Sequence, residues 1–282
     1  MLPFDLVNAF EGKLAAVRKL DRTGRVTVLE LDTVLGLRKA LIAVNLHGPA
    51  GIATRPAGRQ PAEPLELYDM EGCPFCRLVR EALTDLDLDV LIYPCPKGGD
   101  CYRPLVERLG GKQLFPYLMD PNTGVDLYES ADIIDYLYRE YGGRPAPAAW
   151  RLRTLRTASS FAASLPRGGR GLRSQDSEPA KEPLILYSFE ASPFARLVRE
   201  RLCELQLPFL VRQCGRDQWQ DWLLPQVRAA LDMDYQPSQR HRQELVARTG
   251  RVAIPYLIDP NTGEEHFESG QILDYLQETY AR

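Results

Sequence analysis

Two cysteines, Cys73 and Cys76, are spaced so that both could take part in thiol chemistry. They lie in GCPFCRLVRE, residues 72–81, between a short apolar stretch and a run whose apolar residues recur at helical spacing. This pattern predicts the first thiol at a helix N-terminus, where free amides and the helix dipole stabilise a thiolate. Cys73 would then attack a disulfide, and Cys76, one turn into the helix, would be the resolving thiol or a spectator. Pro74 suits the first helical turn because that turn leaves its N–H groups without intrahelical partners.

The same scaffold occurs a second time without its thiols. In ASPFARLVRE, residues 191–200, Ser192 and Ala195 stand where the first copy has cysteines. A serine hydroxyl cannot form a disulfide. The chemistry of the two copies must therefore differ, although their surroundings are nearly the same.

The duplication extends over most of two segments and predicts the architecture. Residues 63–95 align without gaps on residues 182–214, with 18 of 33 positions identical. Residues 115–141 align on residues 254–280, with 15 of 27 identical. The second copy therefore carries 20 additional residues between its two blocks. They include QWQDWLLPQVRAALDMDYQ, residues 218–236, which we interpret as an additional helix.

Each copy has the pattern strand, helix, strand, helix, strand, strand, helix. In the first copy, alternation and β-rich composition predict strands, helical periodicity predicts helices, and Ser130 is placed as the N-cap of the last helix. The first three elements predict a parallel unit with a right-handed crossover. The predicted elements of the first copy are strands at 65–70, 89–94, 115–120 and 125–130, and helices after Cys73, at 103–110 and at 131–141.

These segments predict a chain of four parts. The parts are an N-terminal helical extension and tether at 1–62, a first domain at 63–143, a linker at 144–181 and a second domain at 182–282. The linker is locally basic between residues 151 and 173, which we interpret as a solvated helix rather than a phosphate-binding patch.

Composition argues against several classes of protein. The formal charge of −3 and the isoelectric point near 5.8 give no general attraction to nucleic acid or membranes. No apolar run approaches the roughly 18 residues of a membrane span, and the N-terminus lacks the pattern of a secretory signal. Six cysteines in 282 residues do not form a disulfide scaffold, so a reducing, cytoplasmic compartment is expected.

The order of elements, the Cys-Pro-aromatic-Cys motif, the Phe-Pro before a strand and the Glu-Ser before the last helix resemble glutaredoxins. They resemble even more the N-terminal domain of glutathione transferases, and the whole chain resembles proteins with two such domains in tandem. The resemblance covers about residues 63–141 and 182–280. It implies an α/β protein of two tandem thioredoxin-like domains, with glutathione as cosubstrate and no metal.

The resemblance also implies roles for individual residues. Cys73 corresponds to the nucleophile, and Pro116 to a cis-proline that faces it. The cis bond would present the backbone of Phe115 to the cysteinyl part of glutathione. Glu129 and Ser130 correspond to the pair that holds the γ-glutamyl end of the tripeptide, through the carboxylate, the hydroxyl and the helix-end amides.

Two further sites follow from the same resemblance. Lys112 or Gln113 lies where the family often places a residue for the glycyl carboxylate. The second domain resembles the serine-type transferases, in which the hydroxyl stabilises the thiolate of bound glutathione. That domain could therefore be a second glutathione pocket, or a degenerate copy that serves only in packing. The equivalent positions in the second domain are Ser192, Ile254, Pro255, Glu268 and Ser269.

The expected function is glutathione-dependent thiol–disulfide exchange, or deglutathionylation, through Cys73. Two alternatives stay open: a transferase that conjugates glutathione to small electrophiles, with Ser192 activating glutathione, and a non-catalytic module that binds glutathione or a protein. Cys95 and Cys101 could complete a zinc site with the first pair, but their spacing is unlike that of structural zinc sites. A regulatory disulfide between Cys95 and Cys101 is a further alternative.

Overall fold

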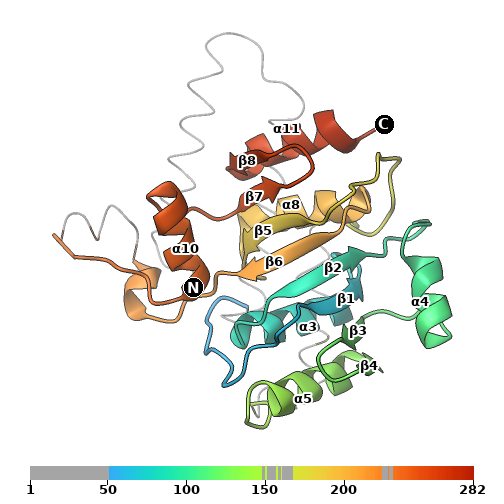
Figure 1. Cartoon of the computed structure of the whole chain (residues 1–282), viewed down its shortest axis with the longest axis horizontal. Helices are drawn as coiled ribbons and strands as arrows, with labels where there is room; N and C mark the ends of the chain where they lie inside the picture. Colours follow the sequence, from blue (N-terminus) through green and yellow to red (C-terminus); the bar gives the residue numbers. More distant parts are fainter. Residues whose placement is uncertain are drawn as a thin grey trace.

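A computed structural model of the chain describes most of the duplicated region. Residues 1–50 of the predicted N-terminal extension and tether (1–62), and part of the predicted linker (144–181), lie outside the described residues. Figure 1 shows two α/β modules, which we call module 1 and module 2 in chain order. The described residues are 51–147, 150, 157, 160, 168–223, 228 and 231–282.

Both modules have the thioredoxin-like order of elements that the sequence predicted. In each, two parallel strands connected by a helix are followed by a helix, an antiparallel hairpin and a last helix. Module 1 consists of β1 (Leu65–Asp69), α3 (Pro74–Asp85), β2 (Val90–Pro94), α4 (Arg103–Gly110), β3 (Tyr117–Asp120), β4 (Val125–Tyr128) and α5 (Ser130–Glu140). Module 2 consists of β5 (Leu184–Ser188), α8 (Pro193–Glu204), β6 (Phe209–Gln213), η3 (Trp219–Trp222), α10 (Arg240–Thr249), β7 (Tyr256–Asp259), β8 (Glu264–Phe267) and α11 (Ser269–Tyr280).

The two modules share one sheet of eight strands. Its order is β4-β3-β1-β2-β6-β5-β7-β8, so the outer parallel strand of each module meets its counterpart at the centre. There β2 pairs antiparallel with β6, with Leu91 opposite Leu210. The pairing satisfies the backbone groups that an isolated module would expose at this edge. The modules are therefore joined by strand pairing as well as by side-chain packing.

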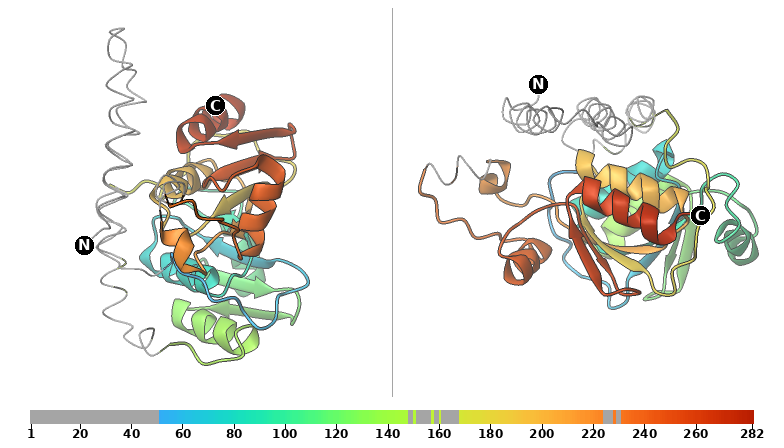
Figure 2. Two further views of the ribbon diagram at one scale, coloured as in Figure 1. Left: turned by 90° about the vertical axis from the view of Figure 1, so that its left-hand side faces the viewer. Right: turned by 90° about the horizontal axis from the view of Figure 1, so that it is seen from above.

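The main hydrophobic core is continuous across the two modules. It lies between the sheet and the helices α3, α5, α8 and α11, and it contains buried side chains from both copies, such as Leu86 and Leu205. Figure 2 shows these helices together on one side of the sheet. Two smaller clusters lie near α4 and α10. Within the described segments, no helix combines the length and the apolar character needed to cross a membrane.

Each module is preceded by a short tether that lies against the other module. The amide of Ala191 in module 2 donates to the carbonyl of Gly51 (3.0 Å), and the amide of Gly72 in module 1 donates to that of Gly171 (3.4 Å). Gly51 and Gly171 have φ values of +72° and +71°, a conformation that suits glycine. The two tethers, residues 51–54 and 171–174, therefore each pair with the module that they do not precede. They continue into the isolated bridges Ala53–Arg216 and Lys97–Arg173.

The described part of the insertion in module 2 is only partly helical. It contains one turn of 3-10 helix, η3, and a helical residue at Arg228, and residues 231–239 contain no α-helix. The turn ends because Leu223 is extended, with φ −84° and ψ 141°. The sequence continues with Leu-Pro at 224–225, and a residue before proline disfavours helical backbone. Residues 224–227 and 229–230 lie outside the described part of the chain.

Candidate functional site

The helix α3 begins at Pro74, and Cys73 is its N-cap, as the motif predicted. Cys73 has extended backbone, with φ −78° and ψ 125°, and its amide donates to the carbonyl of Met70 (3.0 Å). Its own carbonyl accepts the first helical bond from Arg77 (3.1 Å). These bonds hold Cys73 at the end of the loop that connects β1 to α3. Its sulfur therefore lies at the amide-rich end of α3.

The two cysteines of the motif differ in their contact with solvent. Cys76 is 0% exposed, whereas Cys73 is 7% exposed. Both residues are buried, and Cys73 is the less completely enclosed of the two. Of the two, Cys73 is therefore the residue closer to solvent.

The same two thiols differ in acidity. A hydrogen bond from the Cys76 thiol is the largest influence that lowers the pKa of Cys73, to about 7; burial opposes it, and the backbone amides of Cys76 and Phe75 add to the lowering. Burial raises the pKa of Cys76 well above its ordinary value. The sequence had assigned the stabilisation to the helix end. The amides do contribute, but the neighbouring thiol contributes more.

We predict that the alkylation rate of Cys73 by iodoacetamide rises with pH around a midpoint of about 7. Cys76→Ala should move this midpoint upward because the thiol donor is lost, and Cys76→Ser should largely preserve it because a hydroxyl can still donate. The label should be quantified on the Cys73 peptide by mass spectrometry, since Cys101 is also exposed. A midpoint near 9 in the unsubstituted protein would contradict the prediction.

Strand register brings the other predicted elements of module 1 to the same end of the sheet. Tyr117 lies opposite Tyr68 of β1 and opposite Tyr128 of β4. Pro116 precedes Tyr117 and therefore lies beside the end of β1 that leads to Cys73. The segment that follows Tyr128 begins α5 and lies there too. The Cys73 loop, the Phe-Pro loop and the start of α5 thus share one edge.

The Phe115–Pro116 bond is cis, as predicted, and so is its counterpart Ile254–Pro255 in module 2. Pro116 is buried, and Phe115 is partly exposed. The guanidinium carbon of Arg103 lies 4.8 Å from the centre of the Phe115 ring. Sequence reasoning had not singled out Arg103, although it opens the predicted helix at 103–110.

The start of α5 differs by one residue from the prediction. The N-cap is Glu129, not Ser130, and Ser130 is the first helical residue. Glu129 has a φ of +65°, a left-handed value that a non-glycine residue rarely adopts, and Glu268 in module 2 has +64°. In both modules, the chain therefore changes direction at the glutamate, and the helix begins at the serine that follows it. Such strain is often retained at ligand sites. Glu129 is exposed, and Ser130 is partly buried.

The two candidates for a carboxylate contact lie on the exposed side of this edge. The ammonium of Lys112 lies 4.6 Å from the centre of the Tyr128 ring. The Gln113 amide accepts a hydrogen bond from Nε of Arg103 (3.3 Å) and donates to Glu107 (2.8 Å). Both side chains are exposed. Either could therefore contact a ligand that covers the Phe-Pro loop.

The equivalent site in module 2 is more closed. Ser192 is 2% exposed, and its hydroxyl accepts a hydrogen bond from the Ala195 amide (3.2 Å) as the N-cap of α8. Glu268 is exposed, whereas Ser269 is buried. The serine thus has a clear structural role at the end of its helix. Ser192 is also less exposed than Cys73, which is 7% exposed.

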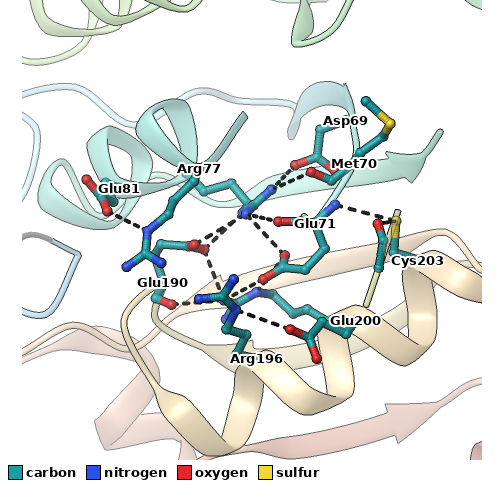
Figure 3. A network of polar contacts seen from close by, with 12 residues as sticks. Asp69, Met70, Glu71, Arg77, Glu81, Glu190, Arg196, Glu200 and Cys203 are labelled. Atoms are coloured by element: carbon teal, nitrogen blue, oxygen red, sulfur yellow. Dashed lines mark hydrogen bonds and ion pairs between the residues drawn. The ribbon is translucent and has the colours of Figure 1, made fainter. Parts of the chain in front are cut away.

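Behind the two helix ends lies a buried network of ion pairs that crosses between the modules (Figure 3). Glu71 follows β1 and Glu190 follows β5, at equivalent positions of the repeat. Each glutamate contacts both Arg80 of α3 and Arg199 of α8, at 2.9 to 3.3 Å. Arg80 also pairs with Asp69. The network therefore positions the loop before Cys73 against the opposite module.

Sequence reasoning had missed this network. Its signal was present, because Glu71, Arg80, Glu190 and Arg199 are identical charged pairs at the offset of the repeat. Two further recurring pairs flank it, Arg77–Glu81 (3.0 Å) and Arg196–Glu200 (3.2 Å). Charged residues preserved on the buried side of two helices indicate a polar interface.

The alternatives for the remaining cysteines can be compared with the geometry. All six cysteines of the chain are described as free thiols. Cys95 is buried near the Tyr93 carbonyl, whereas Cys101 is exposed beside Asp100. In the described portion of the chain, no three histidine, cysteine or acidic side chains are grouped as a metal would require.

A groove of about 710 Å³ runs along the first turns of α5. Ser130 lies on its wall, with Leu78 of α3, Leu127 of β4 and Trp150 from the chain beyond α5. Neither Cys73 nor Cys76 lines it. The groove therefore adjoins the Glu-Ser end of the site rather than the thiol.

Comparison with protein families places these observations in a known group. A family model described as "Glutathione S-transferase, N-terminal domain" matches residues 67–145 and 186–282, together more than half of the chain. The chain belongs to this family. It contains the family's N-terminal domain twice, and each match runs from within the first strand of a thioredoxin-like module past the end of its last helix.

Among solved structures, the chain is similar to a glutathione transferase of Bombyx mori, BmGSTD1. The match has 21% identity and a TM-score of 0.27, and it covers 38% of this chain and 65% of that one. The chain therefore spans just under two thirds of this transferase. The search of curated proteins gave no significant match.

Proposed function

We propose that the protein is a glutathione-dependent thiol–disulfide oxidoreductase that removes glutathione from mixed disulfides through Cys73. The observation that carries the proposal is the difference between the two thiols of the motif. Cys73 is the more acidic and is 7% exposed, whereas Cys76 is 0% exposed and has a raised pKa. A thiolate with a pKa near the ambient pH combines a useful ionised fraction with high nucleophilicity.

The reaction would proceed in two exchanges. The Cys73 thiolate attacks the glutathione sulfur of a mixed disulfide, a bond forms between Cys73 and glutathione, and the substrate leaves as a thiolate that takes up a proton. A second glutathione, as thiolate, then attacks this enzyme adduct. Oxidised glutathione leaves and the Cys73 thiolate is restored. Glutathione is thus the reductant, and the Cys76 thiol stabilises the thiolate before and after the cycle.

The shared edge of module 1 supports a matching place for the tripeptide. The backbone of Phe115 beside the cis bond would hold the cysteinyl part, and Glu129 with Ser130 would hold the γ-glutamyl end. Lys112 would face the glycyl end. The open surroundings of these residues suit a glutathionylated protein or small molecule as substrate. A reducing cytoplasm, where glutathione is abundant, is the compartment in which we propose that it acts.

Incubation with oxidised glutathione tests the assignment. We expect one glutathione adduct per chain, mapped by mass spectrometry to Cys73 and released by reduced glutathione. The remaining five cysteines serve as internal controls, and exposed Cys101 is the most informative, since exposure alone would favour it. An adduct on Cys101 with none on Cys73 would exclude the proposed nucleophile.

The transferase alternative assigns glutathione activation to Ser192. The hydroxyl of Ser192 is buried and already accepts the Ala195 amide. These two features favour a helix cap over contact with a ligand sulfur. We therefore place the glutathione chemistry in module 1.

A further inference from the structure

Two arginines occupy corresponding places in the two modules. Arg103 begins α4 and Arg242 lies in the first turn of α10, separated by the same 139 residues that relate the second blocks of the repeat. Nη1 of Arg103 donates to the carbonyl of Cys95 (3.0 Å), and Nε of Arg242 donates to the carbonyl of Cys214 (3.0 Å). These cysteines are themselves equivalent. Both guanidiniums are therefore anchored at the same point of the fold.

The Arg103 guanidinium lies between the two loops that frame the proposed site. It covers the Phe115 ring at 4.8 Å, and its Nη1 is 3.9 Å from the sulfur of Met70, whose carbonyl accepts the Cys73 amide. Its Nε contacts Gln113. Within the described ranges of the chain, no carboxylate lies at ion-pair distance from Arg103. A guanidinium in this position can donate hydrogen bonds to an anionic group of a ligand.

In module 2 the corresponding guanidinium already has a carboxylate. Oδ1 of Asp221 lies 3.4 Å from Nη1 of Arg242, and the Asp221 side chain is fully buried. The hydroxyl of Tyr235 also donates to this carboxylate (2.5 Å). Asp221 belongs to η3, within the 20 residues that module 1 lacks. The glutamine that accompanies Arg103 is replaced by Val252 at the equivalent position.

We propose that Asp221 is a built-in ligand that occupies the carboxylate-binding place of module 2, and that Arg103 binds the glycyl carboxylate of glutathione in module 1. The inference rests on the proposed function, since it names how the same tripeptide is held. It assigns one glutathione site to the chain. It also explains how module 2 can retain the cis-proline and the Glu-Ser pair without a ligand. Asp221 of the insertion supplies the negative charge that a ligand carboxylate would otherwise bring to Arg242.

Titration calorimetry with S-methylglutathione, which cannot exchange disulfides, tests the site of module 1. We expect one equivalent to bind per chain. Arg103→Gln should weaken binding about tenfold to a hundredfold, because a charge-assisted hydrogen bond to the carboxylate is lost. It should also abolish the preference for S-methylglutathione over its glycyl ethyl ester. Arg108→Gln, which removes an exposed charge from the same helix, is the matched control and should leave both quantities unchanged.

Asp221→Asn tests the site of module 2. With the carboxylate replaced by an amide, Arg242 loses its anionic partner, and a second equivalent should bind. Asp221→Asn with Arg242→Gln should return to one. Two equivalents in the unsubstituted protein, or one in Asp221→Asn with an intact thermal transition, would overturn the inference about module 2. If Asp221→Asn does not fold, the stoichiometry of the unsubstituted protein and the Arg103→Gln result still decide. Absence of any binding would refute the proposed function itself, whereas an unchanged ester preference in Arg103→Gln would refute only the role of Arg103.

Discussion

Cys73→Ser is expected to reduce glutathione-dependent turnover of a mixed disulfide by about a thousandfold or more. The serine hydroxyl is not ionised at neutral pH and cannot form the adduct on which both exchanges depend. The measurement is kcat/KM with a glutathionylated peptide, followed through the release of oxidised glutathione.

Two matched variants separate the nucleophile from its surroundings. Ser192→Ala changes the equivalent position of module 2 and should leave turnover nearly intact, because that hydroxyl caps α8. Cys76→Ser should retain most of the activity, since glutathione performs the second exchange and a hydroxyl can replace the thiol as donor. Equal losses in Cys73→Ser and Ser192→Ala would show that the two modules act together, contrary to the division proposed here.

Glu190→Gln is expected to lower the free energy of unfolding by about 3 kcal/mol, the order of cost of breaking a buried ion pair. Glu190 lies between Arg80 and Arg199, and its loss leaves two buried guanidiniums with too little negative charge. Chemical denaturation would measure the change. Glu178→Gln, which breaks an exposed pair with Arg282, is the control and should unfold like the unsubstituted protein. Equal stability of Glu190→Gln and the unsubstituted protein would contradict the assigned role of the network.

The same residue predicts a pH dependence. Arg199 and Arg80 lower the pKa of Glu190 to about 2, although burial alone would raise it. A carboxyl group with a lowered pKa contributes stability above its ordinary pKa near 4.5 and loses it as the pH falls toward 2. Burial raises the pKa of Asp69 to about 6, so its titration acts in the opposite direction, reducing stability as the pH rises through that range. Both proteins contain Asp69. The difference between Glu190→Gln and the unsubstituted protein should therefore shrink below pH 4.5.

Much of the fold could be predicted because local signals and the repeat agreed. The Cys-Pro motif predicted the start of α3, and the Phe-Pro resemblance predicted the cis bond between Phe115 and Pro116. The pairing of β2 with β6 could not be predicted, because both strands already have a parallel partner within their own module. Whether the remaining free edges of β2 and β6 pair with each other depends on how the two folded modules fit together, which local sequence patterns do not specify.

The site was predicted less completely, for identifiable reasons. The Glu-Ser pair was recognised, but Ser130 was taken as the cap because serine commonly has that role, whereas here the left-handed Glu129 begins the helix. Arg103 and Arg242 lie outside the two gap-free blocks, so the repeat did not draw attention to them. Asp221 lies in a segment interpreted as helix, and its contact with Arg242 arises only from the three-dimensional path of the insertion.

The contacts of each tether with the opposite module affect whether the two modules separate when the chain between them is cut. Because the segment that leads into each module pairs with the other module, a single cut in the chain between them should leave the two fragments associated through these contacts and through the β2–β6 pairing. A module produced alone would lack the tether that contacts the start of its own first helix. Its own tether would have no partner module to contact. The pair of modules, rather than either module alone, is thus the unit that satisfies these backbone groups.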